Sequence, residues 1–209
     1  MSALNRLAFA LGRRDEAPNQ ELARELVDQQ DRNGIAEIVA GLRSRDRKIQ
    51  AGCIKVLYEV GYRDPALIAP YVTAFFQLLQ SRQNRLVWGG MIALSTIAET
   101  QAAAIFDRIG EVKQAMEQGS VITVDSGVKT LARVAAQDPA YRTALFPYLL
   151  DHLRCCRPKD VPQHAESVLA AVDTENRAAF QQVLETRLPL LSPAQKTRVR
   201  RVLKEAASR

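Results

Sequence analysis

Apolar positions along the chain recur at the spacing of an α-helix, in segments that resemble one another. The segments AGCIKVLYEV from Ala51, WGGMIALSTI from Trp88 and DSGVKTLARV from Asp125 align without gaps at a period of 37 residues. Within each segment the apolar residues lie three, six or seven positions apart, which indicates helices and not strands. A fourth copy, HAESVLAAV, follows with Leu169 and Val172 in register at an offset of 38. The pattern therefore predicts a series of repeated helices.

Each copy is followed by a turn and a second helix. The segments DPALIAPYVTAFFQLL from Asp64 and DPAYRTALFPYLLDHL from Asp138 are visibly related. In both, the Asp is placed to cap the helix, and a Pro takes the first helical position, where its missing N–H costs nothing. A second Pro follows in each, at Pro70 and Pro147, where the helix either kinks or properly begins. Further helices are predicted at 21–30, 35–42, 103–118, 178–190 and 193–207.

Helix pairs that repeat every 35 to 40 residues resemble the units of HEAT and armadillo-type (ARM-repeat-like) proteins. The resemblance covers roughly residues 20–192. HEAT units often carry an Asp in the turn, as at Asp64 and Asp138, but the basic residue early in the second helix is not regular here, which leaves HEAT and armadillo open.

This resemblance implies an all-α fold, an α–α superhelix (HEAT-like solenoid) of four to five antiparallel helix pairs. It also implies binding of a macromolecule, usually protein and sometimes nucleic acid. We expect residues 1–209 to form a single α-solenoid domain. Within it, 1–19 would be an N-terminal helix or arm, 20–192 the helical repeats and 193–209 a basic C-terminal helix.

A pair of glycines, Gly89 and Gly90, lies inside the second copy. Small residues stand at the position of Gly90 in all the copies, namely Cys53, Gly127 and Ala165. Because Gly in a helix interior costs up to about 1 kcal/mol relative to Ala, repeated small residues predict a close approach of neighbouring helices. A phosphate-binding loop would need a preceding strand and a different glycine spacing.

The single tryptophan, Trp88, precedes these glycines, where the sister repeats carry Ala51 and Asp125. It lies close to Arg85 on the same helix. Two interpretations are open: Trp88 fills a gap between repeats, or it is a recognition residue of the kind favoured at binding hot spots.

Composition describes an ordinary globular chain, with 47% hydrophobic and 25% charged residues and a net charge of +6. The whole excess of positive charge lies in 187–209, and the rest of the chain is balanced. No apolar run reaches the roughly 18 to 20 residues that span a bilayer, and 1–14 is interpreted as a short amphipathic helix, not a signal peptide. Three cysteines are too few for a disulfide framework, which predicts a reducing, cytoplasmic location.

The loops between repeats are rich in arginine, whereas the loops within repeats carry mainly acids. In a solenoid this division predicts one basic and one acidic edge, and the planar guanidinium suits carboxylate or phosphate ligands. The edge is then a solvated surface, a site for an acidic protein, or a site for nucleic acid. The predicted binding residues are Arg43, Arg45, Arg47, Lys48, Arg82, Arg85, Trp88, Arg154, Arg157 and Lys159.

The sequence contains few residues of the types that serve catalysis or metal binding, with two histidines and three cysteines. Four residues, His152, Cys155, Cys156 and His164, could converge on a tetrahedral ion, but there is no C-x-x-C pair and adjacent cysteines rarely bind one zinc together. We predict no metal site and no catalytic residue, because the chain has two histidines and no nucleophile elbow. Some HEAT-like solenoids excise alkylated DNA bases with aromatic residues and an Asp, but no such constellation is evident here.

The sequence therefore predicts a non-catalytic scaffold or adaptor that binds an acidic protein partner through its arginine-rich edge. Nucleic acid is the alternative ligand, and an alkylpurine-glycosylase-like enzyme is a more distant one. We expect no cofactor, no membrane association and no small-molecule substrate.

Overall fold

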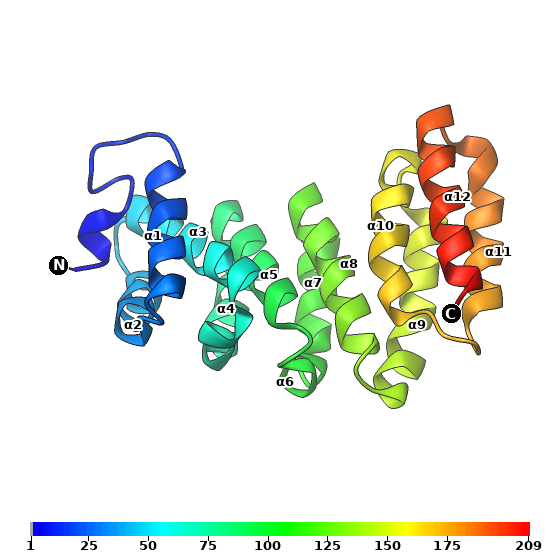
Figure 1. Ribbon diagram of the computed structural model, residues 1–209, viewed down its shortest axis with the longest axis horizontal. Coiled ribbons are helices and arrows are strands. Elements are labelled where there is room, and N and C mark those ends of the chain that lie inside the picture. Colours follow the sequence, from blue (N-terminus) through cyan, green and yellow to red (C-terminus); the bar gives the residue numbers. More distant parts are fainter. Residues whose placement is uncertain (1) are drawn as a thin grey trace. The chain divides into compact units, whose positions relative to one another are not determined.

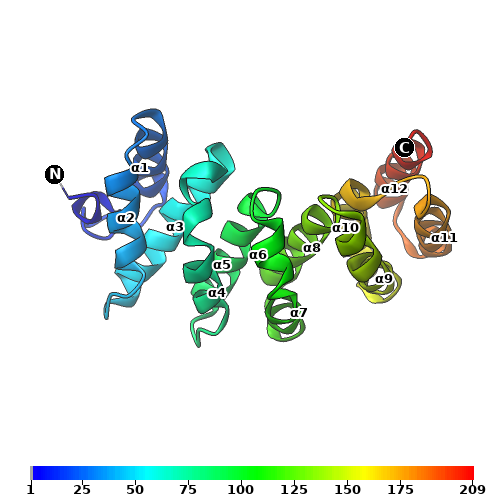
Figure 2. The same cartoon turned by 90° about the horizontal axis from the view of Figure 1, so that it is seen from below.

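The computed structural model describes residues 2–209, and over this range it consists of helices and connecting turns without strands. Figures 1 and 2 show these helices and the turns that join them. None of these helices combines the length and the apolar character that crossing a membrane requires. The all-α prediction is confirmed.

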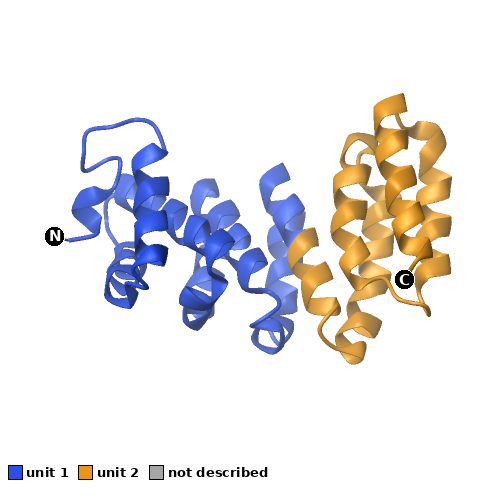
Figure 3. Cartoon of the chain, in the orientation of Figure 1, with its two compact units in different colours: residues 1–127 blue, residues 128–209 orange. Residues whose placement is uncertain are grey.

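The chain divides into two compact units, residues 1–127 and 128–209, as Figure 3 shows. The boundary falls inside α8 (Val121–Ala135). Unit 1 holds seven further α-helices: α1 (Ala17–Asp28), α2 (Arg32–Gly41), α3 (Arg47–Arg63), α4 (Val72–Leu79), α5 (Asn84–Ile97), α6 (Ala102–Phe106) and α7 (Ile109–Gln118). Unit 2 holds four: α9 (Pro139–Cys155), α10 (Val161–Val168), α11 (Arg177–Arg187) and α12 (Pro193–Ala207).

The repeated apolar positions form the cores of the units. Leu57 on α3, Leu94 on α5 and Leu131 on α8 have no exposed surface, and the same holds for Val60, Ile97 and Val134. In unit 1, α3 lies between α1 and α5, with α2 and α4 packed against these helices. In unit 2, α10 and α11 each pack against both α9 and α12. The predicted repeat register is therefore confirmed.

Pro70 and Pro147, for which the sequence allowed either a kink or the start of a helix, differ in the structure. Asp64 caps a 3₁₀ turn (Pro65–Leu67) by accepting from the Ala66 N–H, and a second 3₁₀ turn (Ala69–Tyr71) contains Pro70. The helix α4 begins only after it. Pro147, in contrast, lies inside the continuous helix α9, which Asp138 caps through the Ala140 N–H.

One predicted helix is wrong, and a second is interrupted. Residues 2–14, the described part of the first of these segments, form one 3₁₀ turn (Leu4–Arg6) followed by turns, and no α-helix. The chain reverses there, because Gly12 has a positive φ of 69° and the Arg13 N–H donates back to the Ala8 carbonyl. The segment is held instead by the Glu37 carboxylate, which accepts from the backbone N–H groups of Ala3 and Leu4.

The expected helix over 103–118 is split into α6 and α7. Arg108 leaves the helical region between them, with φ −116° and ψ 21°. Its guanidinium donates to both oxygens of Glu111, at 2.7 and 3.0 Å, and lies 4.0 Å from the ring centroid of Phe76. The break therefore places the Arg108 guanidinium over the Phe76 ring of α4. The C-terminal helix was predicted with its observed bounds, and Ser192 and Gln195 form a capping box at its start.

Candidate functional site

The glycines of the second repeat bring α5 close to its neighbours. A Cβ at Gly89 would lie 2.6 Å from Cγ1 of Ile54 on α3. A Cβ at Gly90 would lie 2.9 Å from Cβ of Leu78 on α4. Both distances are too short for a real contact, so the predicted packing role of the two glycines is confirmed.

This close approach positions Trp88 against α3. The Trp88 ring is half-buried, with its centroid 6.1 Å from that of Tyr58 on α3. The Arg85 guanidinium carbon lies 5.5 Å from the Trp88 centroid, in cation–π geometry. Trp88 thus packs between α3 and α5 and contacts the Arg85 guanidinium. Its role in recognition stays a prediction.

Arg85 links α5 to α1. Its Nη2 lies 2.5 Å from Oε1 of Glu16, which also accepts from the Asn19 amide at 3.0 Å. Partial burial works to raise the pKa of Glu16, but the hydrogen bonds from Asn19 and Arg85 outweigh it and hold this pKa below its ordinary value. Glu16 is therefore a charged partner for Arg85 at neutral pH.

Asn19 extends the same network to the N-terminal segment. It is a buried polar residue, 4% exposed, and its Oδ1 accepts from the Ala8 N–H at 2.9 Å. A chain of hydrogen bonds thus runs from Ala8 through Asn19 and Glu16 to Arg85. A buried amide needs hydrogen-bond partners for both its oxygen and its nitrogen. These hydrogen bonds therefore hold the N-terminal segment against the repeats.

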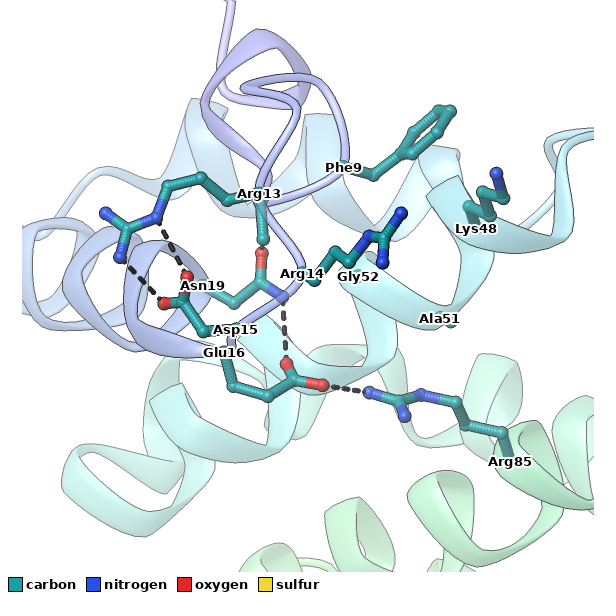
Figure 4. Close-up of a pocket in the computed structure, with 11 residues that line it drawn as sticks. Phe9, Arg13, Arg14, Asp15, Glu16, Asn19, Lys48, Ala51, Gly52 and Arg85 are labelled. Atoms are coloured by element: carbon teal, nitrogen blue, oxygen red, sulfur yellow. Dashed lines mark hydrogen bonds and ion pairs between the residues drawn. The ribbon is translucent and has the colours of Figure 1, made fainter.

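A pocket of about 380 Å³ opens above this network (Figure 4). The N-terminal segment forms one wall, and α1, α3 and α5 complete it. Figure 4 shows the Arg14 side chain extending from that segment toward α3, with Phe9 and Lys48 nearby. The lining residues are Ala8, Phe9, Arg13, Arg14, Asp15, Glu16, Asn19, Lys48, Ala51, Gly52 and Arg85.

The charges of the pocket are only partly balanced. Arg13 donates two hydrogen bonds to Asp15, each 2.9 Å long, and this contact holds the Asp15 pKa below its ordinary value. Arg85 is paired with Glu16. Across residues 2–209, neither Arg14 nor Lys48 takes part in an ion pair. The Lys48 ammonium lies 4.9 Å from the centroid of Phe9, whose side chain is 41% exposed.

The other predicted arginines of unit 1, apart from Arg85, do not line this pocket. Arg45 and Arg47 are exposed at the start of α3, directly before Lys48 in the chain. Arg43 lines a separate groove of about 490 Å³ between α2 and α4. Arg82 lines a third depression beside α5 and α7. Over the described chain none of these four arginines forms an ion pair.

The predicted cations of unit 2 have neighbours of opposite charge. Arg154 lies 2.5 Å from Asp151 and Arg157 lies 2.6 Å from Asp160, in each case three residues away in the chain. Lys159 is exposed. The clusters of the two units thus differ in how far their charge is neutralised locally.

Unit 2 also brings together three of the four residues considered for a metal. One ring nitrogen each of His152 and His164 and the Sγ of Cys156 all lie within 4.8 Å of one another. Cys155 is exposed and outside the cluster. Burial raises the pKa of the Cys156 thiol to about 11.

Of the residues that line the pocket, the sequence analysis predicted only Lys48 and Arg85 as binding residues. Arg14, Phe9 and Asn19 lie in or near a segment without repeat pattern, and nothing in the spacing of Glu16 and Arg85, 69 residues apart, indicates their contact. The pair Arg13-Arg14 was the one visible signal, a basic dipeptide beside an apolar patch.

Comparisons with known proteins agree with this architecture. No family model matches the chain, and no curated protein matches it in sequence. An engineered protein matches with a TM-score of 0.68 over 100% of both chains, at 17% identity. A designed armadillo repeat protein in complex with the peptide (KR)4 matches with a TM-score of 0.66 at 12% identity, over 90% of this chain and 86% of that chain.

Kap121p matches with a TM-score of 0.63 at 14% identity, over 90% of this chain and 20% of Kap121p. At these identities the likeness shows the fold alone. The chain has an armadillo/HEAT-like repeat fold, which confirms the predicted α-solenoid class.

Proposed function

We propose that the chain is a non-catalytic scaffold, and that unit 1 binds an acidic segment of a protein partner. The binding surface consists of the pocket of Figure 4 and the exposed cations at the start of α3. One observation carries the proposal: two pocket cations, Arg14 and Lys48, have no ion pair within residues 2–209. A carboxylate ligand would supply the missing counter-charge.

The shape and the apolar lining favour a peptide segment. The pocket of about 380 Å³ is within the range of sites that hold a small group or a few side chains. Phe9, which lines the pocket, exposes 41% of its surface. An acidic segment that also carries an apolar or aromatic side chain would satisfy both features.

The designed armadillo protein supports this proposal by a contrast in charge. Its peptide, (KR)4, is basic. The pocket of unit 1 has four cations and two acids in its lining. Charge complementarity on the same fold therefore favours an acidic peptide for this chain.

A direct test measures binding of a fluorescein-labelled peptide of alternating Asp and Glu with one central Phe. We expect saturable binding by the full chain that weakens as salt is raised, because the contacts are partly exposed ion pairs. The double variant Arg14→Glu/Lys48→Glu should lose at least tenfold in affinity. The matched control is Arg24→Glu/Arg32→Glu, which reverses two exposed arginines of unit 1 outside the pocket and changes the net charge by the same amount as the pocket variant.

Equal losses in the two double variants would overturn the proposed surface, since net charge alone would then explain them. Tighter binding of a DNA or RNA duplex than of the acidic peptide, lost in the pocket variant, would replace the protein partner with nucleic acid. The proposal includes a reducing, cytoplasmic location. It is supported by the three free thiols, Cys53, Cys155 and Cys156.

A further inference from the structure

Three soft ligand groups meet in unit 2, where α9 ends and α10 begins. His152 Nε2 and His164 Nδ1 lie 3.0 Å apart, and their ring centroids are 4.8 Å apart. The thiol of Cys156 lies within 4.8 Å of a nitrogen of each ring. His164 is 1% exposed, whereas His152 and Cys156 are half-buried, so the cluster is anchored in the core and reached from solvent.

Local structure holds these groups in place. His152 and Cys156 are four residues apart, which puts them on one face at the end of α9, and the Cys156 N–H closes the helix by donating to the His152 carbonyl at 2.8 Å. A 3₁₀ turn (Pro158–Asp160) and the start of α10, with Pro162 in its first turn, return the chain so that His164 faces α9. The three residues of this turn, together with Pro162 in the first turn of α10, restrict the chain between the two histidines.

The distances fit one small divalent ion. With Zn–N bonds of about 2.0 Å and Zn–S bonds of about 2.3 Å, the ligand atoms of a tetrahedral site lie about 3.3 to 3.6 Å apart. The two nitrogens are already at 3.0 Å and the thiol is within 4.8 Å. The ion therefore needs a slight separation of the imidazoles and an inward turn of the half-buried Cys156 side chain.

We propose that His152, Cys156 and His164 bind one divalent transition-metal ion of the Zn²⁺ class, with the fourth position taken by water or by an external ligand. Two imidazoles and one thiolate are the donor types that Zn²⁺ prefers in proteins. As the sulfur–metal bond forms, the thiol releases its proton to solvent. Each imidazole stays neutral, with its proton on the nitrogen that does not bind the ion.

The surrounding charges are compatible with this ion. Arg187 is directed to the backbone, since it donates to the carbonyl oxygens of Arg154 and Cys156. Asp160 is paired with Arg157 at 2.6 Å. The thiolate therefore supplies the negative charge within the cluster itself, and the bound ion would link α9 to α10 across the turn.

Cobalt is a suitable probe, because a thiolate bound to tetrahedral Co²⁺ gives a charge-transfer band in the near ultraviolet and visible d–d bands. The experiment titrates the purified full chain with CoCl₂ in a non-thiol reductant and then displaces the cobalt with ZnCl₂. We expect one cobalt per chain, both sets of bands, and their loss on addition of Zn²⁺. Zn²⁺ should also raise the thermal midpoint, because it binds the folded unit.

The chain offers a matched control in the adjacent cysteine. Cys155→Ser should bind cobalt as the wild type does, whereas Cys156→Ser should lose the charge-transfer band and at least tenfold in affinity. His152→Gln, at a half-buried position, should lose affinity while keeping the thiolate band at high cobalt; circular dichroism shows whether each variant is folded. Absence of the bands in the wild type, or their equal loss in both cysteine variants, would overturn the site.

Discussion

The two arginine-rich loops of the molecule look alike in sequence and differ in the structure. RSRDRK, residues 43–48 of unit 1, and RCCRPK, residues 154–159 of unit 2, were predicted as parts of one binding edge. In unit 2 the two arginines lie against Asp151 and Asp160. In unit 1 the arginines of the loop form no ion pair with any residue from 2 to 209.

The difference shows that the position of the nearest acid, and not the number of cations in the loop, decides whether its arginines form ion pairs. Asp151 and Asp160 each lie three residues from their arginine, within helix-like segments where such neighbours meet. The acid of the unit 1 loop, Asp46, caps α3 instead and accepts from the Lys48 N–H at 2.7 Å. Its carboxylate accepts a hydrogen bond from the backbone, and the neighbouring cations form no ion pair within residues 2–209.

The largest effect that tests this comparison is on affinity for an acidic peptide. Arg47→Glu/Lys48→Glu in unit 1 should weaken binding about 100-fold, or about 2.7 kcal/mol, because it replaces available cations with anions. Arg154→Glu/Arg157→Glu in unit 2 carries the same change of charge and should weaken binding less than twofold. Fluorescence polarisation at fixed salt measures both, and a similar loss in the two variants would abolish the distinction between the loops.

The next effect concerns the free energy of unfolding and is large in unit 2 and small in unit 1. Arg187 of unit 2 donates to two backbone carbonyls at the end of α9, so Arg187→Ala should lower the free energy of unfolding by about 2 kcal/mol. Arg47 of unit 1 has no such contact, and Arg47→Ala should change it by less than about 0.5 kcal/mol. Urea denaturation followed by circular dichroism gives both values. If Arg47→Ala proved the more destabilising, the arginines of unit 1 would be structural.

A smaller effect is expected from removing the acids of unit 2. Asp151→Asn/Asp160→Asn leaves Arg154 and Arg157 without their partners, while folding is little affected because both ion pairs are on the surface. The variant should gain about threefold in peptide affinity and a steeper dependence on salt. If affinity and salt dependence were unchanged, the ion pairs of Arg154 and Arg157 would not be the reason why this loop binds the peptide weakly.

The smallest effect is a pH dependence that both units share. The pKa of Glu166 in unit 2 lies below its ordinary value of 4.5, because Arg198 and Arg201 hydrogen-bond to it against the opposing effect of burial. The pKa of Glu16 in unit 1 is lowered as well, by Asn19 and Arg85 against burial. A carboxylate with a lowered folded-state pKa contributes stability fully above pH 4.5, and this contribution is lost as the pH falls through the lowered value.

Glu16→Gln and Glu166→Gln should therefore each reduce the drop in thermal midpoint between pH 6 and pH 3. Glu166 bonds two arginines and Glu16 bonds one, so the Glu166 variant should show the larger reduction. Parallel profiles for wild type and both variants would contradict the assignment.

Features that recur along the chain were predictable from the sequence. The small residues at Gly89 and Gly90, the caps at Asp64 and Asp138, and the buried repeat positions follow from periodicity and helix termini, which are local properties. The pocket was not predictable, because it depends on contacts such as Glu16 to Arg85 that join distant parts of the chain. The structure of the N-terminal segment was not predictable either. Its apolar residues are spaced as in a helix, but the chain reverses at Gly12, which has a positive φ.

The hydrogen bonds that run from Ala8 through Asn19 and Glu16 to Arg85 have a consequence for how such a site diversifies. The repeats supply a generic platform, and a short non-repeating segment supplies Phe9 and Arg14 to the pocket. A change in that segment alone would alter the ligand without disturbing any repeat core. If unit 1 binds the acidic segment proposed above, its selectivity would thus be carried by an appendage that three polar side chains fasten to the repeats.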